Sequence, residues 1–380
     1  MKIKSKLPDV GITIFTIMSK LAAEHNAINL SQGFPDFDAP DRLIELVVKY
    51  MRSGFNQYAP MEGIPELRSQ IAAKVKKIYG ADVDPDKEIT VTSGATEALY
   101  ASISAVVNPG DEVVIFEPAY DSYKPAVKLN GGIPVFIQLK FPEYRIDWNE
   151  VTEAVSSRTK LIILNSPHNP TGTVLSGKDI NSLRELTHNT DILIISDEVY
   201  EHIIFDGLTH ASMLRFPELA EKSFVISSFG KTYHTTGWKI GYCIAPEILS
   251  TEFRKIHQFL TFASNTPVQY AYADMMKEKS YYNNLAIFYQ KKRDKFISCL
   301  EASGLRVLPC SGTYFLMVDY SAVSDESDYT FAERITTEYG VAAIPPSAFY
   351  NKKQDDKVLR FCFAKKDETL EKAAEILCRL

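Results

Sequence analysis

Short apolar runs recur along the first two thirds of the chain, and each is followed by a polar turn or by a turn that contains glycine or proline. Within the runs apolar and polar residues do not alternate, which is typical of strands buried on both faces. Such strands belong to a largely parallel sheet with helices on either side. The predicted strands cover residues 89–92, 113–116, 161–164, 192–195, 224–226 and 240–245.

Helical patterns lie between several of these runs, for example at 96–107 and 177–187. The alternation of strand and helix predicts an α/β fold. From about residue 282 a charged helical stretch leads into GTYFLMVDY, a further helix near 330–339 and VLRFCFAK, which predicts a smaller α+β unit. We therefore expect a large domain at 46–281, a small domain at 282–380, and an N-terminal arm at 1–45 that completes the small domain.

Composition excludes several classes of function. A formal net charge of −6 provides no basic surface for a nucleic acid backbone.

We also expect no metal site. The five cysteines form no CxxC pair and the histidines form no HExxH motif. Glu198 and His202 are spaced like metal ligands but lack an obvious third ligand. No apolar run is long enough for a membrane span and the N-terminus does not resemble a signal peptide, so the expected location is the cytoplasm.

The polar motifs stand where predicted strands end. They read SGAT, EPAY, NSPHNPTG, SDEVY and SSFGK. In open α/β sheets, ligands bind in the crevice at the carboxyl ends of the strands. A single pocket could therefore collect all five motifs.

Each motif has a structural and a chemical interpretation. A helix is predicted to begin at Gly94, Ala95 and Thr96. These residues either only cap that helix or also bind a phosphate through the free amide groups at its start. Asp197 is either a helix cap or a buried carboxylate that needs a cationic partner, such as a protonated ring nitrogen. The prolines of NSPHNPTG restrict the direction of Asn169, and Tyr200 follows in the first turn after Asp197.

Two further side chains have competing interpretations. Tyr120 is either a core residue or a stacking surface for a ligand ring. Lys231 is a surface charge, a phosphate ligand or a nucleophile; the P-loop explanation of its GKT context fails, because Val225 stands where that motif requires glycine. Together the motifs supply a phosphate site, an aromatic face, an acid for a ring nitrogen, groups for a ring oxygen and a lysine, which complement pyridoxal 5′-phosphate.

The same residues resemble a known family, the class I aminotransferases of pyridoxal-phosphate fold type I, and within it the methionine aminotransferase and kynurenine/glutamine transaminase branch. The resemblance spans nearly the whole chain. It is carried by SQGFPDFDAP, NQYAPMEGIPELR, SDEVYEHIIFDG, SSFGKTYHTTGWKIGYCIAP, GTYFLMVDY and LRFCFAK. It implies a mostly parallel seven-stranded sheet sandwiched by helices in the large domain.

The resemblance also implies roles for the cofactor site. Lys231 would form the Schiff base (aldimine) with the cofactor and later carry the substrate α-proton, and Asp197 would keep the ring nitrogen protonated. Asn169 and Tyr200 would bond the ring oxygen and Tyr120 would stack on the ring. The phosphate would be bound by Gly94, Ala95, Thr96, Ser228 and Lys239, the last standing where the wider family commonly has arginine.

Further implications concern the partner subunit and the substrate. Tyr58 matches a tyrosine that reaches the phosphate of the neighbouring subunit, which implies a homodimer. Arg360 matches the arginine that binds the substrate α-carboxylate, beside Asn169 and Gly33. Phe15 and Phe34 would line an apolar pocket that suits methionine, aromatic residues, glutamine or kynurenine as amino donor in a ping-pong reaction with a 2-oxo acid.

Three other functions compete with this prediction. A cysteine-conjugate β-lyase shares the scaffold and differs mainly in its leaving group. A cofactor-binding sensor without turnover usually carries a DNA-binding domain, for which the chain before Ser31 has no room. A nicotinamide oxidoreductase is disfavoured because no GxGxxG motif follows a strand.

Overall fold

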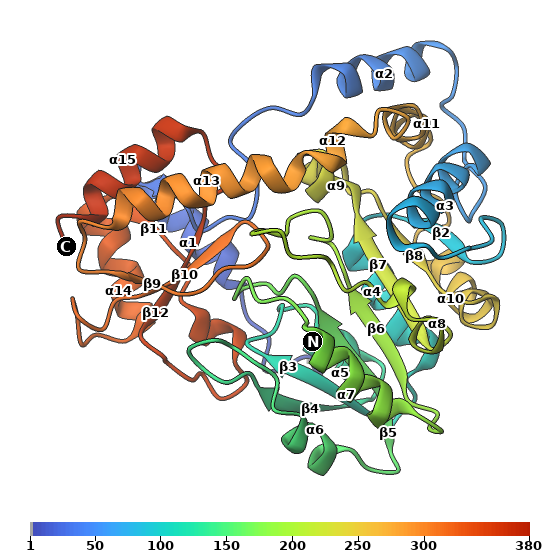
Figure 1. The fold of residues 1–380 in the computed structure, drawn as a ribbon, viewed down its shortest axis with the longest axis horizontal. Helices are drawn as coiled ribbons and strands as arrows, with labels where there is room; N and C mark the ends of the chain where they lie inside the picture. The colour runs from blue at the N-terminus through green and yellow to red at the C-terminus, as the bar shows by residue number, and fades with distance from the viewer. Residues whose placement is uncertain (1–2) are drawn as a thin grey trace.

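The computed structural model describes residues 3–380, in which a central sheet of seven strands dominates the larger part of the molecule (Figure 1). Every neighbouring pair is parallel except those that involve β8, which runs antiparallel to both β2 and β7. The predicted α/β fold with a mostly parallel seven-stranded sheet is confirmed. In spatial order the strands are β2 (Ile89–Thr92), β8 (Gly241–Ile244), β7 (Ser223–Ser228), β6 (Leu193–Asp197), β5 (Thr159–Asn165), β3 (Glu112–Glu117) and β4 (Ile133–Gln138).

Successive side chains of the central strands enter two different hydrophobic cores. Val114 of β3 belongs to one core, whereas its neighbours Val113 and Ile115 belong to the other. One face of the sheet is covered by α4 (Ala95–Val106), α5 (Tyr123–Leu129) and α10 (Glu247–Leu260). The other is covered by α2 (Asp41–Arg52), α3 (Pro65–Tyr79), α6 (Trp148–Ala154), α7 (Gly177–Thr187), α8 (Pro217–Ala220) and α11 (Thr266–Met275).

A third core holds the smaller part of the molecule together. Helix α13 (Leu285–Leu300) runs into it from the larger part (Figure 1). This part contains an antiparallel sheet and a two-stranded parallel pair, β1 with β11. Its elements are α1 (Ile14–Glu24), β1 (Ile28–Asn29), β9 (Arg306–Val307), β10 (Phe315–Asp319), α14 (Asp328–Arg334), β11 (Val341–Ala342), β12 (Val358–Cys362) and α15 (Asp367–Leu377).

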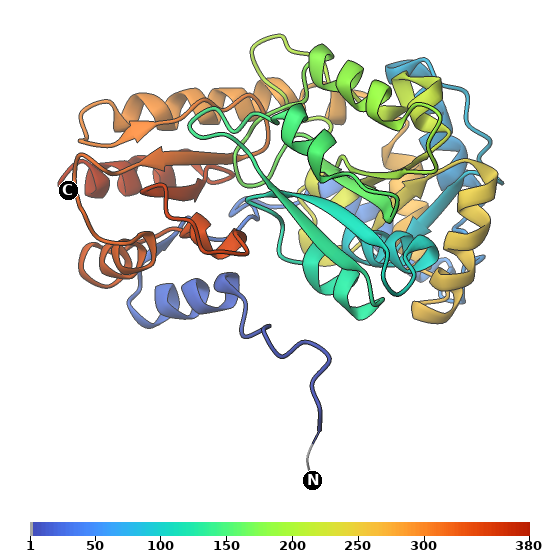
Figure 2. The ribbon, with the colours of Figure 1, turned by 90° about the horizontal axis from the view of Figure 1, so that it is seen from below.

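Residues 3–13, which precede α1, extend away from the body of the molecule (Figure 2). From α1 onward the chain joins the smaller part, since Ile28 of β1 pairs with Val341 of β11. The domain boundaries at residues 45 and 281 stay a prediction. No helix within residues 3–380 is both long and apolar enough to cross a bilayer.

Candidate active site

Lys231 lies on the short helix α9 (Phe229–Thr232), directly after strand β7. Its Nζ is 2.7 Å from the hydroxyl of Tyr314 and 3.3 Å from the carbonyl oxygen of Gly33. Loss of solvent around the ammonium, reinforced by the positive charge of Arg360, lowers the pKa of Lys231 from 10.5 to about 8. A much larger share of the amine is therefore uncharged near neutral pH, as a nucleophile requires.

Asp197 is the last residue of β6 and is buried. Its carboxylate accepts hydrogen bonds from the hydroxyl of Tyr123 at 2.6 Å and from the amide of Val199 at 3.3 Å. Burial raises the pKa of Asp197 to about 6. Because both donors are neutral, the buried carboxylate is suited to a cationic partner such as a protonated ring nitrogen.

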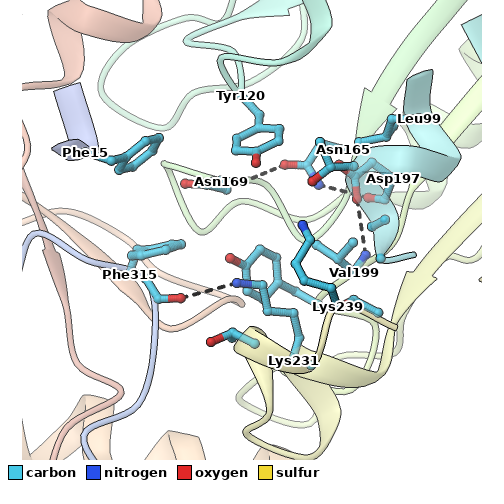
Figure 3. A pocket seen from close by; sticks show the side chains of 18 of the residues that line it. Phe15, Leu99, Tyr120, Asn165, Asn169, Asp197, Val199, Lys231, Lys239 and Phe315 are labelled. Carbon is cyan, nitrogen blue, oxygen red and sulfur yellow. Dashed lines mark hydrogen bonds between the residues drawn. The ribbon is translucent and has the colours of Figure 1, made fainter. Parts of the chain in front are cut away.

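Asp197 and Lys231 line the same cavity (Figure 3). Burial also raises the pKa of Tyr200, so its hydroxyl keeps its proton and can donate a hydrogen bond. Asn165 supports this side of the cavity, because its Nδ2 donates to the carbonyl of Asp197 at 2.8 Å and its Oδ1 accepts from the amide of Asn169 at 2.8 Å.

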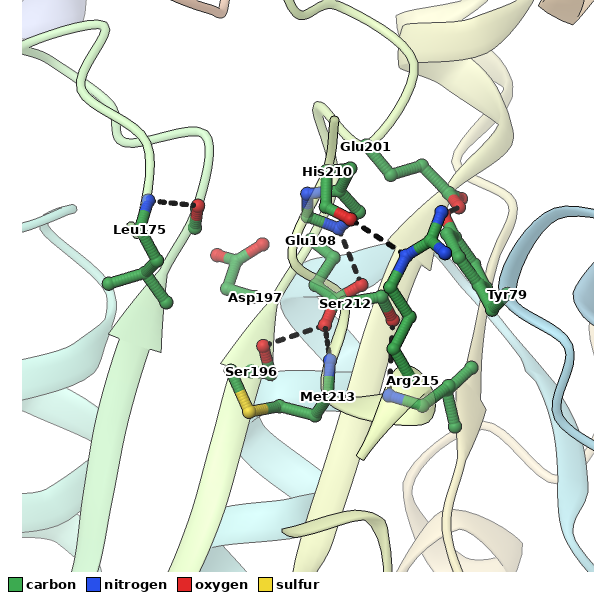
Figure 4. A network of polar contacts seen from close by, with 12 residues as sticks. Tyr79, Leu175, Ser196, Asp197, Glu198, Glu201, His210, Ser212, Met213 and Arg215 are labelled. Carbon is green, nitrogen blue, oxygen red and sulfur yellow. Dashed lines mark hydrogen bonds and ion pairs between the residues drawn. The ribbon is translucent and has the colours of Figure 1, made fainter. Parts of the chain in front are cut away.

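Two buried glutamates hold the turn that carries Asp197 and Tyr200 (Figure 4). Glu198 accepts hydrogen bonds from Ser196 at 2.9 Å and from the amide of Met213 at 3.0 Å, and it contacts His210 Nε2 at 2.7 Å. Glu201 forms a buried ion pair with Lys74 at 2.6 Å. Glu198 thus bonds to His210 and not to His202. Among the described residues there is no cluster of His, Cys, Asp and Glu that could hold a metal ion.

The amino end of α4 lines the cavity and has no side-chain cap. Gly94 precedes the helix and offers no side chain to cap its free amide groups. A methyl group on Gly94 would lie 3.4 Å from Lys239 Nζ, so this ammonium group stands beside the helix end. Ser228 at the end of β7 lines the same part of the cavity. The helix dipole, the free amides and the lysine charge all favour a phosphate group.

Arg360 lies on β12 and is fully buried, with 0% of its surface exposed. Its Nη1 donates to Asn169 Oδ1 at 2.9 Å and its Nη2 to the carbonyl of Ser31 at 2.7 Å. The guanidinium carbon lies 3.9 Å from the centre of the Phe315 ring. Both acceptors are neutral, and Nε has no partner within residues 3–380. The buried cation is therefore suited to a carboxylate ligand.

Most of the predicted site residues meet in this one cavity. Phe34 does not: it is 44% exposed, and its carbonyl accepts a hydrogen bond from Lys365 at 2.8 Å. Tyr58 is 86% exposed and lines a separate hollow next to Thr266. The roles of Phe34 and Tyr58 stay predictions. The cavity is lined by the other predicted residues, Phe15, Gly33, Gly94, Ala95, Thr96, Tyr120, Asn169, Asp197, Tyr200, Ser228, Lys231, Lys239 and Arg360.

The structure adds residues that the sequence did not single out. Tyr123 bonds to Asp197 and Tyr314 bonds to Lys231. Gln32 and Phe315 line the cavity beside Gly33 and Arg360. Tyr123 stands three residues after Tyr120 in EPAYDSY, and Tyr314 lies in GTYFLMVDY, so both belong to motifs that the sequence marks, but no signal in the sequence indicates these contacts.

Comparisons with known proteins identify the family of this chain. The family model of class I and II aminotransferases matches residues 25–377. A methionine aminotransferase of Escherichia coli is 53% identical over 99% of this chain and 98% of its own length. A kynurenine–oxoglutarate transaminase of Dictyostelium discoideum is 37% identical over 97% of this chain and 94% of its own length.

Solved structures give the same result. The crystal structure of YbdL from Escherichia coli, identified as having a methionine aminotransferase function, superposes with a TM-score of 0.98 at 53% identity over 100% of both chains. The chain therefore belongs to the class I and II aminotransferases, and it is an enzyme that uses pyridoxal 5′-phosphate to transfer amino groups between amino acids and 2-oxo acids.

Proposed function

We propose that the enzyme transfers the α-amino group of methionine and of aromatic amino acids to a 2-oxo acid by a ping-pong mechanism, with Lys231 as the catalytic lysine. The observation that carries this proposal is that Lys231, Asp197 and Arg360 line a single cavity. The similarity to a methionine aminotransferase and to kynurenine transaminases supports the choice of substrates.

The residues of the cavity fit the parts of the cofactor. Its phosphate is assigned to the amides of Gly94, Ala95 and Thr96 with Ser228 and Lys239, where helix dipole and charge favour an anion. Tyr120 is assigned to the ring face, and Asn169 and Tyr200 to the ring oxygen. When bound, pyridoxal phosphate supplies a conjugated ring that accepts the electron pair left when the α-proton departs.

Three side chains carry the proposed chemistry. Asp197, held by Tyr123, keeps a proton on the ring nitrogen. The Lys231 amine takes the α-proton of the substrate and returns it, a task that its pKa of about 8 suits near neutral pH. Arg360 orients the substrate through its α-carboxylate, and the surrounding protein excludes water from this buried charge pair.

The remaining walls favour an uncharged substrate side chain. Phe15 and Phe315 are aromatic, and Gln32 holds Phe15 in place by donating to its carbonyl at 3.1 Å. Among residues 3–380, Arg360 is the only arginine that lines the cavity, so the described lining offers no second arginine for a side-chain carboxylate. Apolar contact is non-directional and accommodates both a thioether and a ring.

A homodimer is part of the proposal. Tyr58 projects into solvent at the rim of a hollow formed with Ala263 and Thr266, and exposed Phe259 and Phe262 lie nearby in the chain. If a partner subunit covers this surface, Tyr58 would reach the phosphate site of that partner subunit. We also propose a cytoplasmic location, which agrees with five cysteines that are all free thiols.

A substrate panel tests the proposed function. The purified enzyme is mixed with one amino acid at a time and no 2-oxo acid, and the change in cofactor absorbance is followed. Methionine, phenylalanine and tyrosine should react faster than aspartate. S-substituted cysteine should yield a new amino acid once a 2-oxo acid is added; release of pyruvate and ammonia instead would indicate a β-lyase. Preference for aspartate would contradict the proposal.

A further inference from the structure

The amine of Lys231 rests in a small polar site on the side of the cavity formed by the smaller part of the molecule. The site consists of the Tyr314 hydroxyl, 2.7 Å from Nζ, and the Gly33 carbonyl, 3.3 Å from Nζ. Nζ also lies 5.3 Å from the centre of the Tyr314 ring and 5.5 Å from that of Tyr200. Two aromatic faces and two oxygen atoms therefore surround the lysine amine.

The hydrogen bonds of this site have a defined direction. The Tyr314 hydroxyl donates to the carbonyl of Gly33, which leaves its oxygen lone pairs to accept from Lys231. Burial raises the pKa of Tyr314 well above 10, so the phenol keeps its proton throughout the working range. Tyr314 is therefore an acceptor for the lysine ammonium and does not compete for its proton.

From this geometry we infer that Tyr314 is a further catalytic residue, which binds the amine of Lys231 whenever that amine is not joined to the cofactor. In the first half-reaction the substrate amino group would displace the lysine from the cofactor, and in the second half-reaction the lysine would stay free until the product amino acid leaves. In both, the freed amine would have to stay in the cavity to carry the proton. The Tyr314 hydroxyl and the Gly33 carbonyl keep it at a defined position. The inference rests on the proposed role of Lys231.

The site is rigid, as this role requires. Tyr314 is fully buried, and its ring packs edge-on against Phe315 at 4.9 Å and Tyr200 at 5.1 Å. Gly33 approaches the same cluster so closely that a methyl group on it would lie 2.7 Å from Phe315 Cζ. The carbonyl of Gly33 is thus held against Tyr314 by packing as well as by the hydrogen bond.

The test removes one oxygen atom, the hydroxyl oxygen of Tyr314. In Tyr314→Phe the ring remains, but the hydroxyl that accepts from Lys231 and donates to the Gly33 carbonyl is lost. The ammonium form of Lys231 depends on that acceptor more than the neutral amine does. The pKa of Lys231 in cofactor-free protein should therefore fall by about one unit. It is measured as the pH dependence of Lys231 acetylation, followed by peptide mass spectrometry. In the loaded enzyme, kcat should fall about tenfold while KM changes little.

Tyr289→Phe is the matched control. Tyr289 is as deeply buried as Tyr314, its ring lies 5.6 Å from the Tyr314 ring, and its hydroxyl has no hydrogen-bond partner in the described structure. This variant should leave the titration of Lys231 unchanged. Near-wild-type thermal unfolding of both variants would show that neither change disturbs the fold.

The outcomes separate this inference from the proposed function. An unchanged Lys231 titration in natively folded Tyr314→Phe, or an equal shift in Tyr289→Phe, overturns the inference. The titration uses protein without cofactor or substrate, so it does not depend on which amino acids react. If the titration shifts as expected while the substrate panel shows no transamination, the proposed function fails and the lysine site remains.

Discussion

The Tyr123 hydroxyl donates a hydrogen bond of 2.6 Å to Oδ2 of Asp197, and both side chains are buried. Burial raises the pKa of the carboxyl to about 6, and this hydrogen bond opposes the rise because it stabilises the charged form. The phenol itself stays protonated, since burial beside a carboxylate raises its pKa well above 10. Tyr123 thus keeps Asp197 ionised in a site with little water.

Tyr123→Phe should move the acid limb of the activity profile to higher pH. Without the donor the pKa of Asp197 rises above about 6, so the carboxylate is protonated at a pH where the wild-type group is still charged. We expect a shift of about one unit in the profile of kcat. Tyr144→Phe serves as control, because the Tyr144 hydroxyl is buried without a partner among the described residues and lies outside the cavity. An identical acid limb in Tyr123→Phe would contradict this role.

Arg360→Lys should weaken the binding of every amino acid substrate to a similar extent. A lysine provides charge without the paired donors of a guanidinium, and it leaves the Ser31 carbonyl and Asn169 Oδ1 without their donors. We expect kcat/KM to fall about 10- to 100-fold for methionine, phenylalanine and tyrosine alike. Steady-state kinetics with each donor tests this. A defect limited to one side chain would mean that Arg360 contacts the side chain and not the α-carboxylate.

Gly33→Ala should raise KM and lower stability. The added methyl group would meet Phe315, whose ring supports the guanidinium of Arg360 at 3.9 Å. Such overpacking costs about 1–3 kcal/mol in the free energy of unfolding, which urea denaturation measures. Gly11→Ala is the matched control, because nothing lies within 4 Å of its added methyl group. Equal behaviour of the two variants would show that the packing at Gly33 is not tight.

Mixed dimers should reveal whether Tyr58 acts in the partner's site. Lys231→Ala and Tyr58→Ala are each expected to lose most activity, the first by about 10²- to 10⁴-fold because the general base is gone. In a hybrid dimer one site regains both residues if Tyr58 acts across the interface. An equal mixture that exchanges subunits should recover about a quarter of wild-type activity. If Tyr58 acts within its own chain, mixing restores nothing.

The sequence predicted the elements whose pattern is local. The six apolar runs all became strands of the large sheet, because continuous burial on both faces leaves a clear signal. Strand β4 was missed. It lies at the edge of the sheet, begins at the exposed Ile133 and contains Pro134, so its pattern is weak. The reversed direction of β8 also has no local signal, since direction depends on how the chain returns to the sheet.

The active site shows the same division between features with a local sequence pattern and features that depend on the fold. Lys231, Asp197 and Arg360 stand in motifs whose chemistry is visible in the sequence. The contacts of Tyr314 with Lys231 and of Tyr123 with Asp197 join residues 83 and 74 positions apart. A tyrosine in an apolar run resembles any core residue until the fold shows which polar atom its hydroxyl meets. Phe34 illustrates the opposite case, since a place beside Gly33 in the sequence did not bring it into the cavity.

The antiparallel course of β8 has a consequence for how the lysine moves. Gly241 pairs with Thr92 of β2 on one side and with Ser228 of β7 on the other, so the chain leaves and re-enters the sheet at adjacent points. The loop that carries Lys231 is therefore fixed to the sheet at both of its ends, and the proposed phosphate ligands Ser228 and Lys239 lie at those two ends. If Lys231 and the phosphate ligands act as proposed, the lysine side chain could move while Ser228 and Lys239 stay in place, so the cofactor would remain bound while the lysine gives way to a substrate.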